Sequence, residues 1–133
     1  MENIFARHEY LANGVRAAVQ EGWKLNLCAK APEWYSNTVS AILVPEGFDA
    51  NKIVSHALNT YGVAFGTGLG DVAGKVFRIG HLGSLTDAMM LSGLATAEMV
   101  MVDLGLDIKL GSGVAAAQEY YRHGSANALR RSA

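Results

Sequence analysis

The sequence predicts an α+β domain, in which a small three- to four-stranded sheet has helices packed on one face. Three observations lead to this fold class. Apolar residues recur at helical spacing over the first 22 residues, short β-branched runs bounded by proline and glycine follow, and an almost wholly apolar segment occupies residues 88–102. The expected order is one helix, two strands, one helix, two strands and two helices, without an internal repeat or a linker.

The first half of the chain should form two helices around two strands. Helical spacing of apolar residues predicts the first helix, and alternating or β-branched residues predict the strands. Asp49, a residue type that favours helix N-termini, should cap the second helix. The elements expected are a helix ending at Gly22, strands over residues 25–30 and 38–44, and a helix over residues 49–61 that Gly62 ends.

The second half should form two short strands and two helices. A glycine-rich connection joins the strands, and Ser84 with Asp87 three residues later is typical of a capped helix start. The elements expected are strands over residues 63–66 and 75–80, an apolar helix ending near Gly105, and a last helix over residues 113–123 that Gly124 ends, followed by a frayed tail over residues 125–133.

Composition and charge favour one globular domain in a reducing compartment. The net charge of −1 over 133 residues gives no basic field for nucleic acid and no polybasic run for a membrane. The apolar segment at 88–102 is shorter than the roughly 20 residues of a membrane span, and Glu98 interrupts it. The single cysteine, Cys28, suits the cytoplasm. No histidine has metal-ligand spacing, so no metal site is expected.

The glycine run at residues 66–75, GTGLGDVAGK, is not predicted to bind phosphate. A P-loop would need glycine where Leu69 stands, and serine or threonine where Val76 stands. Residues 68–73 fit G-x-G-x-x-A, but a dinucleotide-binding fingerprint must open a helix, whereas a strand follows here. The run is therefore interpreted as a loop between strands.

No residue of the chain is predicted to be catalytic. His81, Ser84 and Asp87 lie near each other in sequence, which is weak evidence because catalytic triads are assembled in space. Glu98 in the apolar helix is expected to be a buried acid with a partner, or one that faces another subunit.

Arg78 interrupts an otherwise apolar strand in the segment GKVFRIGHLGS. Alternation along a strand places Arg78 on the same face as the small residue Gly80. A buried and unpaired guanidinium is costly, so Arg78 should either be paired or face a pocket. Its planar fork suits a carboxylate. Two alternatives stay open at this point: an anionic ligand, or an internal salt bridge to Asp71, Glu98 or another acid.

The run TGLGDVAGKVFRIGHLG, followed by an apolar helix and then by GSGVAAAQEYYR, resembles the C-terminal small domain of class V, fold type I aminotransferases. The branch it resembles comprises serine–glyoxylate and alanine–glyoxylate aminotransferases with their aspartate–glyoxylate relatives. The resemblance runs from about Glu2 to about Arg122 and implies that small-domain fold for residues 1–124. It also implies that Arg78 binds the substrate's α-carboxylate, because Arg78 occupies the position of the family's carboxylate-binding arginine.

The resemblance implies pyridoxal 5′-phosphate chemistry, in which an amino acid such as serine or alanine gives its amino group to the cofactor, and glyoxylate or another 2-oxo acid takes it. In the family the large N-terminal domain supplies the cofactor's lysine and its other ligands. We therefore expect this chain to be a fragment without the large domain, inactive alone and with no cofactor-binding residue. The five lysines, none of which matches the cofactor lysine, are Lys24, Lys30, Lys52, Lys75 and Lys109.

Two other functions compete with this interpretation. The chain could be a freestanding module that binds carboxylates through Arg78 without catalysis, or a structural domain that self-associates. The expected partners are amino acids and 2-oxo acids, the large domain, and further copies of the chain in a homodimer or larger assembly, but neither nucleic acid nor membrane. Trp34 and Tyr35 are expected on the surface that meets a large domain.

Overall fold

The computed structural model describes residues 2–28, 39–80 and 86–132, with side chains placed at 9–28, 40–80 and 86–123. Two of the helices continue into a single π-helical turn. The helical elements are α1 (Glu2–Ala17) with η1 (Ala18–Gly22), α2 (Asn51–His56) with η3 (Ala57–Tyr61), the 3-10 turn η4 (Gly70–Val72), α3 (Asp87–Asp103) and α4 (Ser112–Ser132). The strands are β1 (Asn26–Leu27), β2 (Val39–Leu43), β3 (Gly66–Thr67) and β4 (Val76–Gly80).

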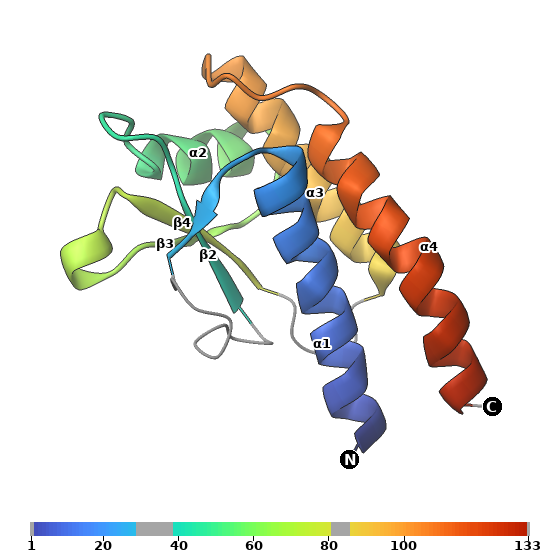
Figure 1. The fold of residues 1–133 in the computed structure, drawn as a ribbon. Coiled ribbons are helices and arrows are strands. Elements are labelled where there is room, and N and C mark those ends of the chain that lie inside the picture. The colour runs from blue at the N-terminus through green and yellow to red at the C-terminus, as the bar shows by residue number, and fades with distance from the viewer. Residues whose placement is uncertain (1, 29–38, 81–85, 133) are drawn as a thin grey trace.

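The four strands form one antiparallel sheet in the order β1-β2-β4-β3. Helices α1 and α4 run side by side next to this sheet, as Figure 1 shows. On β4 the side chains alternate, and Phe77 and Ile79 point into the core. Ile42 is paired with Phe77 and lies on the same face. The sequence therefore predicted the sheet and its alternation correctly.

One hydrophobic core joins this face of the sheet to all four α-helices, which confirms the predicted arrangement of helices on one face. From the sheet, the fully buried side chains of Phe77 and Ile42 pack into this core. The helices contribute Leu11, Val15, Ile53, Leu94, Val100, Met101, Ala117 and Tyr121. Of the methionines on α3, Met90 and Met101 are buried in this core, whereas Met89 and Met99 are exposed.

The buried carboxylate of Glu98 holds the N-terminus of α4. Glu98 is 2% exposed, and its Oε1 accepts hydrogen bonds from the Gly113 N–H, from the Val114 N–H at 2.9 Å and from the Trp23 indole N–H at 2.9 Å. Its Oε2 accepts from the Gly111 N–H at 2.8 Å. A helix N-terminus leaves backbone N–H groups without partners and favours negative charge. The sequence predicted that this buried acid has a partner. Its partners are the N-terminus of α4 and the indole of Trp23.

Two glycines allow this close approach. A Cβ atom on Gly113 would overlap the Trp23 indole and the Glu98 carboxylate. A Cβ atom on Gly22, at the end of η1, would overlap the Gly113 backbone. Side chains at either position would push α4 away from the carboxylate. The glycine predicted to end the first helix thus also brings the backbones of η1 and α4 into contact.

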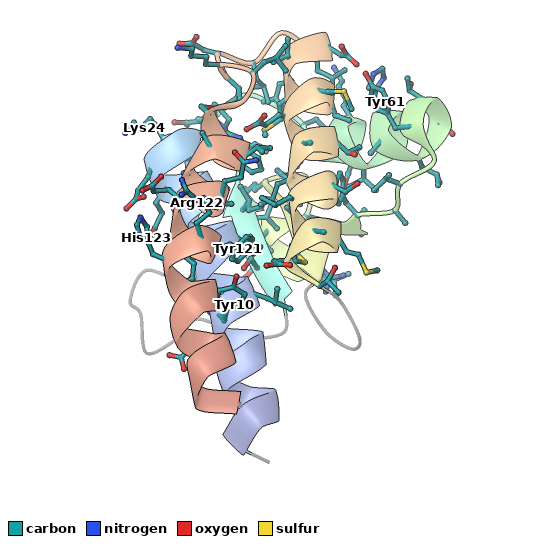
Figure 2. The ribbon with its side chains drawn as sticks, turned by 90° about the vertical axis from the view of Figure 1, so that its right-hand side faces the viewer. Tyr10, Lys24, Tyr61, Tyr121, Arg122 and His123 are labelled. Carbon is teal, nitrogen blue, oxygen red and sulfur yellow. The ribbon has the colours of Figure 1, made fainter. Side chains whose placement is uncertain are left out.

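Two tyrosines connect α1, α3 and α4 by hydrogen bonds, and Figure 2 shows these residues, Tyr10 and Tyr121, between the helices. The Tyr121 hydroxyl donates to the Leu11 carbonyl at 2.7 Å, and the Tyr10 hydroxyl lies 3.1 Å from Asp87 Oδ2. Burial is the main reason why the pKa of Tyr121 lies well above its ordinary value of 10.0. The helix layer therefore contains buried polar contacts as well as apolar packing.

Several predicted element ends differ from the structure. Thr86, and not Ser84, caps α3, since its Oγ1 accepts from the Met89 N–H at 3.1 Å. The prediction that Gly124 ends the last helix is wrong, because α4 continues to Ser132. One glycine costs a helix only about 1 kcal/mol, which the residues that follow it can offset.

Other predicted ends differ less. The predicted strand at 25–30 is limited to β1 in its described part, Asn26–Leu27. Asp49 Oδ1 accepts from the Asn51 N–H at 3.0 Å, as expected near a helix start, although Ala50 occupies the capping position itself.

Removing the Glu98 carboxylate should destabilise the chain. Glu98→Ala leaves the N-terminal amides of α4 and the Trp23 indole without their acceptor, so the free energy of unfolding should fall by about 3 kcal/mol or more. Glu98→Gln should cost about 2 kcal/mol, because one amide N–H₂ then faces backbone donors. Urea denaturation followed by tryptophan fluorescence measures both values.

Glu119→Ala is the matched control. Glu119 lies on α4, is exposed and contacts only His123 one turn away among the described residues, so its removal should change stability by less than about 0.5 kcal/mol. An equal effect of the two alanine substitutions would contradict the role given to Glu98.

Candidate functional site

Arg78 lies in the middle of β4, on the face of the sheet opposite the core. Its neighbours across the strands are Ala41 on β2 and Gly66 on β3, both small. A Cβ atom on Gly80, two residues further along the same face, would have nothing within 4 Å among the described residues. Arg78 is half-buried, and its cross-strand neighbours are small. This is the open surrounding that the alternation of the strand predicted.

The partner of the guanidinium is a backbone carbonyl. Arg78 Nε donates to the Thr67 carbonyl oxygen at 2.9 Å. Within the described parts of the chain, no carboxylate lies within 4 Å of Arg78. Asp71 is exposed on η4, and the Glu98 carboxylate is occupied at the start of α4. The described residues thus do not supply the internal salt bridge that was the alternative to a ligand.

Other residues singled out in the sequence lie outside the described residues, namely Trp34, Tyr35, His81 and Ser84. Asp87 is described, and its carboxylate accepts from Tyr10 and from the Ala88 N–H at the start of α3. The Asp87 carboxylate therefore makes its hydrogen bonds within the helix layer.

The glycine run between β3 and β4 contains the short turn η4 and then continues into strand β4. No helix begins there, so the arrangement required for dinucleotide binding is absent from this described segment. Three side chains able to hold a metal ion gather nowhere in the described ranges. No helix in those ranges is both long and apolar enough to cross a membrane.

An open hollow of about 640 Å³ lies where β2 leads toward α2. All of its charged lining residues are exposed, and none of its lining residues is fully buried. A small-molecule site usually encloses its ligand and offers a few fixed polar groups. The lining residues, which do not include Arg78, are Lys24, Leu25, Asn26, Leu43, Val44, Pro45, Glu46, Gly47, Phe48 and Lys75.

Comparison with known proteins places this geometry in a family. Over all 133 residues the chain is 73% identical to the L-aspartate–glyoxylate aminotransferase of Paracoccus denitrificans, of which it covers 33%. Over 121 residues, 91% of the chain, it is 59% identical to the serine–glyoxylate aminotransferase of Hyphomicrobium methylovorum, of which it covers 30%. The chain belongs to the class V aminotransferase family. It spans about a third of the length of these relatives.

Solved aminotransferases contain the same fold. Pyridoxamine–pyruvate aminotransferase from Mesorhizobium loti superposes with a TM-score of 0.84 at 30% identity, over 92% of this chain and 31% of that protein. Ureidoglycine–glyoxylate aminotransferase from Bacillus subtilis gives a TM-score of 0.80 at 25% identity, over 87% of this chain and 30% of that one. No general family model matches the chain. The chain is thus the C-terminal small domain of a class V aminotransferase, as its motifs indicated.

A surface cluster at the end of α3 was not predicted by any pattern in the sequence, because its members lie far apart along the chain. Asp103 Oδ2 accepts from the Tyr61 hydroxyl at 2.6 Å and lies 3.0 Å from His56 Nε2. Figure 2 shows Tyr61 beside the end of this helix. The Tyr61 hydrogen bond, followed by the one to His56, lowers the pKa of the Asp103 carboxyl below its ordinary value of 3.8. The cluster connects α2 and η3 to α3 and lies on the solvent-exposed surface.

Substituting Tyr61 with phenylalanine should raise the pKa of Asp103, because the hydroxyl that stabilises the carboxylate is lost. In the folded protein the pKa of Asp103 is lower than in the unfolded chain. Its contribution to stability is therefore present above pH 3.8 and is lost as the pH falls through the folded-state pKa. NMR titration of the carboxyl carbon measures this pKa in both proteins. An Asp103 pKa that Tyr61→Phe leaves unchanged would contradict the role given to this hydrogen bond.

Proposed function

We propose that this domain supplies the carboxylate-binding arginine of a pyridoxal-phosphate-dependent aminotransferase. The reaction would move an amino group from serine, alanine or a similar amino acid to glyoxylate or another 2-oxo acid. The observation that carries the proposal is the position of Arg78. It stands on the face of β4 opposite Phe77 and Ile79, beside the exposed Gly80, and has a backbone carbonyl as its partner among the described residues. The family resemblance supports the proposal, because it implies that Arg78 occupies the place of the substrate arginine.

One guanidinium would serve both halves of such a reaction, because amino donor and oxo acceptor each carry a carboxylate beside the reacting carbon. Charge-assisted hydrogen bonds to a carboxylate are strong and directional, so Arg78 would orient the substrate as well as hold it. Gly80 is exposed, and a Cβ atom there would have nothing within 4 Å among the described residues, which would leave room for that carboxylate on the same face of β4. The cofactor, when bound, acts as the electron sink of the transamination.

The described lysines do not fit the amine that carries the cofactor. A lysine that forms a Schiff base is usually activated by burial or by a neighbouring cation. The described lysines are all exposed and lie on separate elements: Lys24, Lys52, Lys75 and Lys109. We therefore keep the prediction that the chain alone is inactive and that a large domain brings the cofactor site. A homodimer or larger assembly and a cytoplasmic location also stay predictions.

A chimeric enzyme tests the role of Arg78. The Paracoccus denitrificans aminotransferase aligns with this chain over all 133 residues, so its matching segment can be replaced by the present sequence. In that holoenzyme Arg78→Ala should raise the KM for glyoxylate and for the amino donor about a hundredfold, as expected when two charge-assisted hydrogen bonds are lost. Steady-state kinetics with each substrate measures the change.

Arg122→Ala is the matched control, because Arg122 is an exposed arginine on α4 and lies outside the proposed site. This variant should keep both KM values. The 133-residue chain assayed alone should show no activity. If Arg78→Ala left both KM values unchanged, the proposal would fail. Saturable binding of glyoxylate or serine by the chain alone, abolished in Arg78→Ala, would instead support the freestanding carboxylate-binding module.

A further inference from the structure

Strand β3 lies against Arg78 and has no part in the role proposed above. We infer that β3 holds the guanidinium in one orientation, so that a substrate carboxylate can bind only through Nη1 and Nη2. This inference rests on the proposed carboxylate-binding role. It assigns a positioning role to Gly66 and to the Thr67 backbone.

The hydrogen bond from Arg78 Nε selects which edge of the guanidinium stays available. An arginine can offer a carboxylate two edges, one formed by Nε and an Nη atom and one formed by the two Nη atoms. The single N–H of Nε is already donated to the Thr67 carbonyl at 2.9 Å. The edge that contains Nε is therefore occupied. The end of the fork, with both Nη atoms, has no hydrogen-bond partner among the described residues and remains for the ligand.

Gly66 permits this arrangement because it has no side chain. It is the cross-strand partner of Arg78, so a Cβ at this position would point toward the arginine side chain. That Cβ would lie 3.0 Å from Arg78 Nε, 3.2 Å from Arg78 Cβ and 3.2 Å from Nη2. These separations are too short for relaxed contacts, and the atoms that must move are Nε and Nη2 of the guanidinium together with the Cβ of the same arginine. A methyl group on Gly66 would thus displace the guanidinium from its position over β3.

The backbone conformation gives no other reason for glycine at this position. Gly66 does not have the positive φ that disfavours other residues, unlike Gly62, Gly70 and Gly74 nearby. Alanine can therefore adopt the same strand conformation, and the effect of Gly66→Ala should be confined to the arginine. This separates positioning of the guanidinium from folding of the strand.

The first test measures the hydrogen bond in the unsubstituted 133-residue chain. The Nε–H of Arg78 should give a slowly exchanging signal in nitrogen-15 NMR spectra, because its proton is donated to a backbone carbonyl. The Nε–H of Arg122, which is exposed, is the internal reference and should exchange at the rate of a solvated arginine. Equal exchange rates of the two signals would overturn the inference without the need for any variant.

The second test uses the chimeric holoenzyme. Gly66→Ala should raise the KM for glyoxylate by about tenfold, since displacement of a binding group by a fraction of an ångström weakens its contacts. The kcat should change by less than about twofold, because the groups that perform the chemistry lie elsewhere. In the 133-residue chain the same substitution should abolish the slow exchange of the Arg78 Nε–H.

Gly93→Ala is the matched glycine control. Gly93 lies within α3, and a Cβ atom there would have nothing within 4 Å among the described residues. This variant should leave KM, kcat and the Arg78 signal unchanged. If Arg78→Ala raised KM and Gly66→Ala did not, the positioning role would fail while the proposed function stood. If Arg78→Ala itself had no effect on KM, the proposed function would fail first.

Discussion

The buried carboxylate of Glu98 is the interaction on which the helix layer depends. It comes from the middle of α3 and satisfies backbone N–H groups at the start of α4 and the indole of Trp23 at the end of η1. Three elements that are distant in sequence therefore meet at one charged group. A buried charge is tolerated only when its hydrogen bonds are made, so this point admits little movement. The absence of side chains at Gly22 and Gly113 lets the backbones come close enough to make those bonds.

This arrangement also removes one internal acid that could have paired with Arg78. Glu98 was one of the acids that could have paired with the arginine inside the protein, and its acceptor capacity is used at α4 instead. The sheet consequently has two different faces. Phe77 and Ile79 pack against the helices, whereas Arg78 stands on the other face between Ala41 and Gly66. A rigid helix layer behind the sheet holds β4 in place, and β3 then orients the guanidinium beside it.

Local sequence patterns predicted the features that depend on neighbouring residues. Alternation along 75–80 predicted the face of Arg78, and the strand expected after the glycine run is present as β4. Features that depend on contacts between distant residues could not be predicted in this way. The Thr67 carbonyl reaches Arg78 only through the pairing of β3 with β4, and the partners of Glu98 include Trp23, 75 residues away. Gly124 was misinterpreted because a single glycine is a weak helix stop when helix-favouring residues follow it. The identity of the proposed anion comes from neither pattern nor packing, because only the family resemblance implies it.

The most direct measurement is a crystal structure of the chimeric holoenzyme with a non-reactive 2-hydroxy acid in the active site. Such a compound has the carboxylate of the substrate and lacks the reacting group. If Arg78 binds the substrate carboxylate, the carboxylate oxygens of the 2-hydroxy acid should lie within hydrogen-bond distance of Nη1 and Nη2 of Arg78, while Nε still donates to the Thr67 carbonyl. A carboxylate bound away from Arg78, or an Arg78 paired with an acid of the protein in the presence of the ligand, would contradict it.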